Sequence, residues 1–145
     1  MGVMAGRTVK DIVADQDLLW IGPEASVLEA VRRMDGRNVA AVLVIENDAL
    51  KGIFTERDLL KRVVAKRRDP AKTTVAQAMT PDPVTIPLDA NALSAMRAMC
   101  RHGIRHLPVT DGTRIAGIVS IRDFVGREIA EFDRERELQD HLWEC

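Results

Sequence analysis

GIFTERD, residues Gly52–Asp58, recurs 65 positions later as GIVSIRD, residues Gly117–Asp123. The same offset aligns residues 21–59 with residues 86–124 without a gap. An internal repeat says more about the fold than any single motif, because the repeated unit determines the whole architecture. The chain therefore contains two copies of one sequence unit, and we expect each copy to form the same supersecondary structure.

Each copy follows the pattern strand, helix, strand, strand, helix, which predicts an α/β fold. In the first copy, Ser26 is expected to cap a helix that stops at Asp35–Gly36. In the second copy, Asn91 begins the equivalent helix and Gly103 supplies its left-handed C-terminal cap. Runs of β-branched residues predict strands at 39–45, 50–55, 104–109 and 115–120, and the stretch 66–83 is predicted to be a linker with a helical turn at 75–79.

In each copy a hydroxyl residue and an aspartate lie where the last strand is expected to end and a helix to begin. These pairs are Thr55 with Asp58 and Ser120 with Asp123. One interpretation is structural, because a hydroxyl followed three residues later by an acid is a capping box that needs no ligand. The other is functional: a helix start attracts anions, the aspartate can accept hydrogen bonds from a ribose diol, and the preceding arginine can pair with phosphate. Two copies that share Gly-Ile and Asp at this place favour a ligand site.

The twice-occurring unit, with its closing G-h-x-[ST]-x-x-D string, resembles the CBS domain family. The resemblance covers residue 21 to about 62 and residue 80 to about 127, and TVKDIVA and TVAQAMT are similar to the lead-in helix of a CBS motif. It implies tandem CBS repeats that form one pseudo-twofold module, with two clefts that accept AMP, ADP, ATP, NAD or S-adenosylmethionine. The expected function is a regulatory sensor that signals adenine-nucleotide occupancy to an unidentified partner protein. The alternative is a ligand-free structural or dimerisation module.

The resemblance also assigns residues to the two clefts, with the hydroxyl and aspartate of each motif holding the ribose. The string IRHLPV, residues 104–109, looks like that of stand-alone bacterial CBS pairs, where Arg105 and His106 would face phosphate. The first copy has Ala40 and Ala41 at these positions, so we expect the second site to bind anions better. The full set of expected binding residues is Val39, Ala40, Ala41, Thr55, Arg57, Asp58, Thr85, Ile86, Ile104, Arg105, His106, Pro108, Ser120, Arg122 and Asp123.

The expected boundaries are residues 8–66 for the first CBS repeat, 67–79 for a linker with a short lead-in helix, 80–127 for the second repeat and 128–145 for a C-terminal helix. The last helix is expected to run on directly from Asp123. Its apolar stripe is larger than a lone terminal helix should expose, so we expect a homodimer in which this helix packs on a second subunit. The stripe consists of Val125, Ile129, Phe132, Leu138, Leu142 and Trp143.

No enzymatic activity is expected. Ser120, His106 and Asp123 have the composition of a hydrolase triad, but no G-x-S-x-G turn surrounds the serine. His102 and His106 have the spacing of a metal pair, but Gly103 interrupts the helix that would align them. The sequence therefore predicts neither a catalytic residue nor a metal ligand.

Composition limits the partners. No apolar run approaches the roughly 20 residues of a membrane span, so no membrane partner is expected. A net charge of −1 and 3% aromatic residues argue against nucleic acid. The basic stretch Lys61–Arg68 is interpreted as a solvated helix face. The first residues lack the basic and apolar regions of a secretory signal, so a cytoplasmic location is expected.

Overall fold

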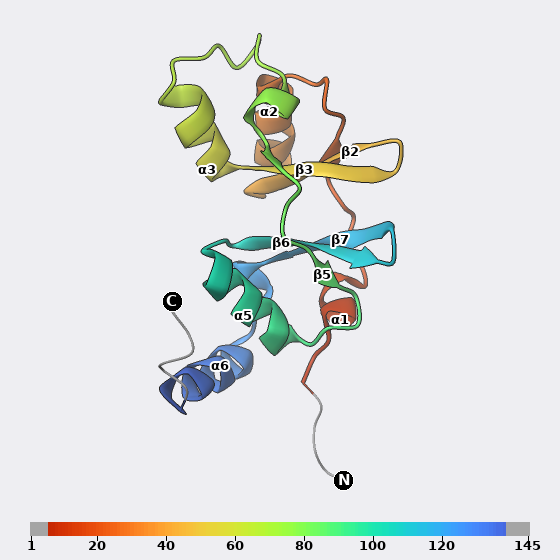
Figure 1. The fold of residues 1–145 in the computed structure, drawn as a ribbon, viewed down its shortest axis with the longest axis vertical. Coiled ribbons are helices and arrows are strands. Elements are labelled where there is room, and N and C mark those ends of the chain that lie inside the picture. Colours follow the sequence, from red (N-terminus) through yellow and green to blue (C-terminus); the bar gives the residue numbers. More distant parts are fainter. Residues whose placement is uncertain (1–5, 139–145) are drawn as a thin grey trace. The chain divides into compact units, whose positions relative to one another are not determined.

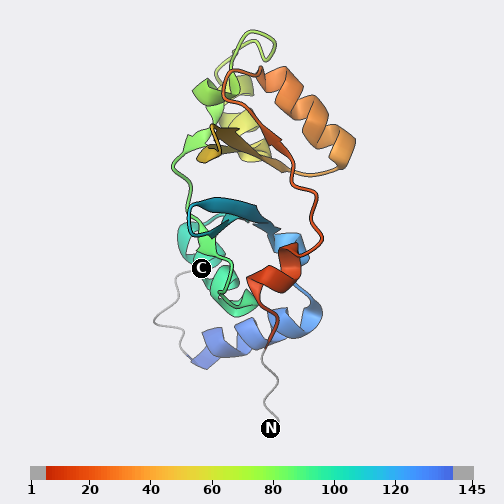
Figure 2. The same cartoon turned by 90° about the vertical axis from the view of Figure 1, so that its right-hand side faces the viewer.

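The computed structural model describes residues 6–138, which divide into two compact units (Figures 1 and 2). The first-copy unit contains residues 17–84 and 113–115. The second-copy unit contains the described part of residues 1–16, together with residues 85–112 and residues from 116 onward. Each lead-in helix therefore packs with the other copy's strands, so the compact units differ from the two repeats taken in sequence order.

The first-copy unit has a four-stranded sheet in the order β1-β2-β3-β4. β1 runs parallel to β2, and the two remaining pairings are antiparallel. This arrangement agrees with the predicted strand, helix, strand, strand pattern. The elements are β1 (Trp20–Ile21), α2 (Val27–Arg37), β2 (Ala41–Glu46), β3 (Ala49–Thr55), α3 (Glu56–Asp58), the π-helix η1 (Leu59–Val64), α4 (Val75–Ala78) and β4 (Thr80–Pro81).

Helix α2 covers one face of this sheet with the apolar stripe that the sequence predicted. Ser26 caps it as expected, because the Ser26 side chain accepts a hydrogen bond from the Glu29 N–H at 3.0 Å. The predicted stop at Asp35–Gly36 is wrong: the helix continues to Arg37, and Asn38 ends it with φ 53°. Asparagine tolerates the left-handed conformation better than most residues, so it replaces glycine as the cap. The core beneath the helix contains Val27, Ala30, Met34, Val42, Val44, Phe54 and Val63.

The second-copy unit repeats this architecture with a three-stranded sheet in the order β5-β6-β7. The predicted caps of its central helix are confirmed: Asn91 accepts from the Ser94 N–H at 2.8 Å, and Gly103 has φ 63°. The elements are α1 (Val9–Val13), β5 (Ile86–Pro87), α5 (Ala92–His102), β6 (His106–Asp111), β7 (Arg114–Ser120), the 3₁₀ turn η2 (Ile121–Asp123) and α6 (Gly126–Leu138).

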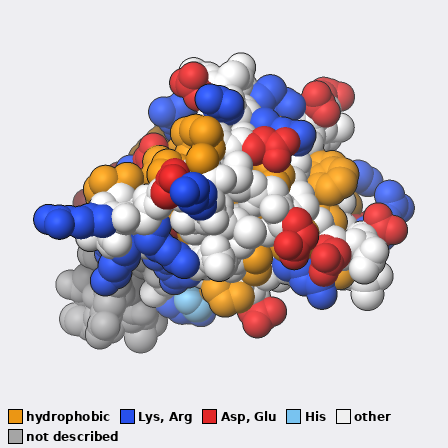
Figure 3. Space-filling view, turned by 90° about the horizontal axis from the view of Figure 1, so that it is seen from above, with side chains coloured by type: hydrophobic (Ala, Val, Ile, Leu, Met, Phe, Trp, Pro, Cys, Tyr) orange, Lys and Arg blue, Asp and Glu red, His pale blue; other side chains and the backbone are white. Residues whose placement is uncertain are grey.

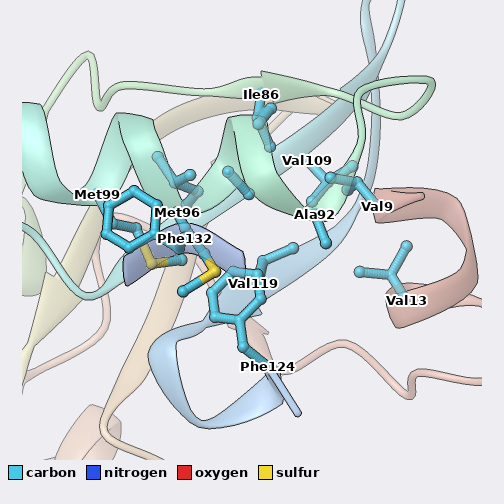
Figure 4. Packing of buried hydrophobic residues seen from close by; sticks show 12 residues of the cluster. Val9, Val13, Ile86, Ala92, Met96, Met99, Val109, Val119, Phe124 and Phe132 are labelled. Atoms are coloured by element: carbon cyan, nitrogen blue, oxygen red, sulfur yellow. The ribbon is translucent and has the colours of Figure 1, made fainter. Parts of the chain in front are cut away.

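The C-terminal helix differs from its prediction in two ways. It does not run on from Asp123, because η2 ends there, Phe124 is extended with ψ 140°, and α6 begins at Gly126. Its Phe132 is 8% exposed and packs in the core of its own unit beside Met96 and Met99 (Figure 4). The stripe is therefore partly satisfied within one chain. Leu142 and Trp143 lie outside the described residues.

The glycine that opens each motif has a packing role. A Cβ atom on Gly52 would lie 2.7 Å from the Thr80 carbonyl oxygen, and one on Gly117 would lie 2.9 Å from Val13 Cβ. Thr80 follows one lead-in helix, and Val13 ends the other. Each glycine therefore lets a lead-in segment lie close to the strand that contains the glycine. At Gly117 the approach also lets the Gln16 side chain pair with the Ile118 backbone at 2.8 and 2.7 Å.

Candidate functional site

The turn after β3 is a complete capping box. The Thr55 N–H donates to Asp58 Oδ2 at 2.9 Å, and the Asp58 N–H donates to Thr55 Oγ1 at 3.4 Å. The Glu56 N–H donates to the Ala40 carbonyl at 3.1 Å, which fastens the turn to the start of β2. The motif of the first copy therefore starts its helix as a capping box, which is the feature that the structural interpretation expects.

The Asp58 carboxylate is also held from outside its own turn. Asp58 is only 6% exposed, Thr80 Oγ1 donates to its Oδ1 at 3.0 Å, and Arg62 Nε lies 3.6 Å from the same oxygen. Both carboxylate oxygens are thus used within the protein. Their burial and these contacts leave little of the Asp58 carboxylate surface accessible to a further donor.

The equivalent turn in the second copy leaves its carboxylate more open. The Ser120 N–H donates to Asp123 Oδ2 at 2.7 Å, and the Ile121 N–H donates to the Arg105 carbonyl at 2.9 Å. Asp123 is half-buried rather than buried, and its Oδ1 accepts no hydrogen bond from any residue between 6 and 138. The turn is anchored instead through its main chain, because Arg7 Nη2 donates to the Asp123 carbonyl at 2.8 Å.

The backbone amides expected to attract an anion are largely used. In the first copy the Glu56 and Asp58 N–H groups already have acceptors, and in the second copy the Ile121 and Arg122 N–H groups do. The helical turn η2 is also only three residues long, whereas α3 continues directly into η1. The backbone N–H groups can therefore contribute little to the expected anion site, and the positive charge would have to come from side chains.

The structure brings several of the predicted residues to these turns. Ala41 pairs with Thr55 across β2 and β3, and Ile86 pairs with Val109, the residue after Pro108, across β5 and β6. The predicted binding residues differ in how exposed they are. Val39, Arg57, Thr85, Arg105 and Arg122 are exposed, Ala40, Thr55, Ile104, His106 and Ser120 are half-buried, and Ala41, Ile86 and Pro108 are buried.

Three residues at the turns were not predicted: Arg7, Arg62 and Thr80. The contact of Arg62 with Asp58 could have been predicted, because the two residues are an i, i+4 pair on a helix. The contact of Thr80 with Asp58 could have been predicted from the pairing of neighbouring strands. Arg7 stands 116 residues before Asp123, and no sequence pattern connects them. It reaches the turn only because α1 packs with the other copy.

The basic stretch Lys61–Arg68 has a local structural use. Arg62 donates to the Met79 carbonyl and Arg68 to the Gln77 carbonyl, so these side chains fasten η1 to the end of α4. Every basic side chain of this stretch is exposed, and the face of the molecule drawn in Figure 3 mixes basic side chains with acidic and apolar ones. This mixture agrees with a solvated helix face.

Two features are absent from residues 6–138. No group of three or more His, Cys, Asp or Glu residues is arranged to hold a metal ion. No helix in this part of the chain has the length and apolar character that membrane crossing requires.

The sequence pattern of the CBS domain matches residues 9–65 and 75–129. The CBS domain-containing protein CBSX3, mitochondrial, of Arabidopsis thaliana is 34% identical over 139 residues, which cover 88% of this chain and 68% of that protein. Four longer Arabidopsis relatives are 33% identical, and this chain spans 24% of their length.

Solved structures give the same result. A signal-transduction protein with CBS domains from Burkholderia ambifaria has a TM-score of 0.79 and 31% identity, covering 86% of this chain and 95% of its own. A Pyrobaculum aerophilum CBS domain protein, solved in complex with AMP, has a TM-score of 0.77, with coverage of 88% and 98%, but 23% identity, which supports the fold alone.

The chain belongs to the CBS domain family and consists of two CBS domains in tandem, a regulatory type of module. The predicted fold class is confirmed, including the C-terminal helix.

Proposed function

We propose that the chain is a regulatory sensor that binds an adenine nucleotide such as AMP, ATP or NAD at the second-copy turn and signals its occupancy to a partner protein. The observation that carries this proposal is the asymmetry of the two aspartates. Asp58 has both carboxylate oxygens engaged, whereas Asp123 has one oxygen without a hydrogen bond among residues 6–138. Because Asp123 is half-buried, this oxygen is accessible to a donor from outside the chain, and a ribose hydroxyl would supply one.

Thermal unfolding with separate additions of AMP, ATP, NAD and S-adenosylmethionine tests this function. A ligand present at 100 times its dissociation constant should add about 2.7 kcal/mol of stability. Inosine monophosphate serves as the matched control for recognition of the adenine base. No stabilisation by any of the four ligands would refute the sensor function and favour the structural module.

The structural module is the second candidate, because both turns are satisfied as capping boxes without a ligand. Under that hypothesis the T-x-x-D and S-x-x-D strings serve only to start helices. Their carboxylates would then affect stability and nothing else.

Charge should make the second site the tighter one. Arg105 is exposed next to the Ser120–Asp123 turn, whereas the equivalent residue in the first copy is Ala40. We expect calorimetric titration with AMP to show one dominant site, weakened about tenfold or more by Arg105→Ala because a charge-assisted contact is lost. Arg101→Ala, on the exposed end of α5, is the control. Two equal sites that both survive Arg105→Ala would contradict the expected asymmetry.

A homodimer is the assembly that the exposed apolar side chains favour. Leu60 and Val64 are 61% and 60% exposed, and the 65-residue repeat places Val125 and Ile129, 46% and 44% exposed, at the same two positions of the second copy. Burying such a side chain is worth about 1.5–3 kcal/mol, so a second copy would gain from covering both pairs.

Val64→Glu or Ile129→Glu should therefore weaken the dimer markedly in sedimentation experiments. Ala76→Glu is the control, because Ala76 is exposed on α4 and carries no large apolar side chain. Deleting the C-terminal residues would be a poorer test, since it would remove the buried Phe132. Dimers as tight as wild type in both glutamate variants would exclude these surfaces.

A further inference from the structure

The two copies hold the same turn through different atoms. In the first copy the anchor is the carboxylate of Asp58, which accepts from Thr80 at 3.0 Å and lies 3.6 Å from Arg62. In the second copy the anchor is the main-chain carbonyl of Asp123, which accepts from Arg7 at 2.8 Å. The second arrangement fixes the turn without using the aspartate side chain.

Arg7 is itself held rigidly. Its Nε and Nη2 donate to the two Glu128 carboxylate oxygens at 2.9 and 2.6 Å, a bidentate pair. Glu128 is 6% exposed, and its Oε1 also accepts from the Val125 N–H at 2.9 Å. One guanidinium thus connects the end of η2 to the first turn of α6.

The backbone around Arg7 fixes the position of this guanidinium. The Arg7 carbonyl accepts from the Ala92 N–H at 2.8 Å, and the Val9 N–H donates to the Ala90 carbonyl at 2.8 Å. In the first copy the Thr73 carbonyl makes the contact equivalent to that of Arg7, and Val63 stands at the position equivalent to Glu128. The ion pair is therefore a feature of the second copy.

The space beside Arg7 shows that it does not contact a nucleotide there. The pocket that Arg7 lines with Asn91 and Glu128 has a volume of about 80 Å³. Pockets for drug-sized ligands are about 300–1,000 Å³, so a nucleotide would not fit. Any effect of Arg7 on nucleotide binding must act through the turn.

We propose that Arg7 is a positioning residue of the nucleotide site: together with Glu128 it holds the Asp123 carbonyl, replaces the anchoring that the carboxylate provides in the first copy, and leaves the Asp123 carboxylate available to a ribose diol. This inference rests on the proposed function. It assigns a role in binding to a residue that lies outside the motif and 116 positions from it.

The test is the double variant Arg7→Met/Glu128→Gln. The glutamine oxygen can still accept from the Val125 N–H, and no buried charge is left without a partner, so the fold is preserved. Arg97→Met is the matched control, because Arg97 also pairs with α6 through Glu135, and its side chain has the same 32% exposure as that of Arg7. Calorimetry with AMP should show affinity about tenfold lower in the double variant and unchanged in Arg97→Met.

Equal AMP affinity in the double variant and wild type, or an equal loss in both variants, would overturn the positioning role. Hydrogen exchange supplies a readout that needs no ligand, at the Ile121 N–H, which donates to the Arg105 carbonyl within the turn. Its exchange should be faster in the double variant alone. A wild-type chain that binds none of AMP, ATP, NAD and S-adenosylmethionine would refute the proposed function, whereas unchanged exchange at Ile121 would refute the positioning role on its own.

Discussion

Arg7→Met should destabilise the protein by about 3 kcal/mol at pH 7. This substitution leaves the Glu128 carboxylate buried without its cation, and breaking a buried ion pair costs about 3–5 kcal/mol. The lower end of that range applies, because the Arg7 side chain keeps 32% of its exposure and water screens the pair from that side. Urea denaturation measures the loss.

The size of this loss should depend on pH. In the wild type the Arg7 guanidinium holds the pKa of Glu128 below its usual 4.5, despite the opposing effect of burial. A lowered pKa in the folded state contributes stability that is present above pH 4.5 and is lost as the pH falls through the folded-state value. In Arg7→Met the pKa of Glu128 should rise relative to the wild type, because burial is then opposed only by the Val125 N–H and Arg127, so the variant's carboxylate takes up a proton more readily as the pH falls.

The difference between wild type and Arg7→Met should therefore shrink from pH 7 to pH 4. Adding Glu128→Gln to Arg7→Met is the control, because it removes the titrating group and should abolish this part of the pH dependence. A loss of the same size at both pH values would show that the carboxylate is not responsible.

Asp123→Asn and Asp58→Asn should have opposite effects on binding and stability. Asp123→Asn should weaken AMP binding by about 1.5–3 kcal/mol, because a charged acceptor for the ribose diol becomes a neutral amide. Its fold should persist, since the remaining amide oxygen can still accept from the Ser120 N–H. Calorimetric titration gives the affinity and urea denaturation the stability.

Asp58→Asn should instead lower the free energy of unfolding by about 1–3 kcal/mol with little change in AMP affinity. Asp58 is buried, and its two oxygens together accept from Thr55 and Thr80. An amide can satisfy only part of this set, because its NH₂ group donates. If both variants lost stability and neither lost affinity, both aspartates would be helix caps only.

Much of the architecture could be predicted because it depends on local patterns. Ser26, Asn91 and Gly103 are caps whose chemistry acts within a few residues, and the two lead-in helices were predicted from the resemblance of TVKDIVA and TVAQAMT to those of CBS motifs. The errors are local too. Helix α2 ends at the Asn38 cap, later than expected, and Phe124 has an extended conformation that separates η2 from α6.

The finer properties of the site could not be predicted, because they depend on contacts between distant segments. The motifs T-x-x-D and S-x-x-D look equivalent in sequence. Their carboxylates differ because Thr80 reaches Asp58, whereas Arg7 reaches the carbonyl of Asp123. Both contacts come from lead-in segments that pack with the other copy, which aligning the two copies at an offset of 65 residues does not reveal.

That exchange has a consequence for how the chain folds. The Val9–Val13 helix leaves the ribosome early, yet its backbone partners at residues 88–92 and the carbonyl that binds Arg7 are made much later. Contacts between residues so distant in sequence are slow to form, because a long loop must close before they give any stabilisation. During synthesis the first strands can pair with each other, but the second-copy unit cannot close until residues up to Glu128 have emerged from the ribosome.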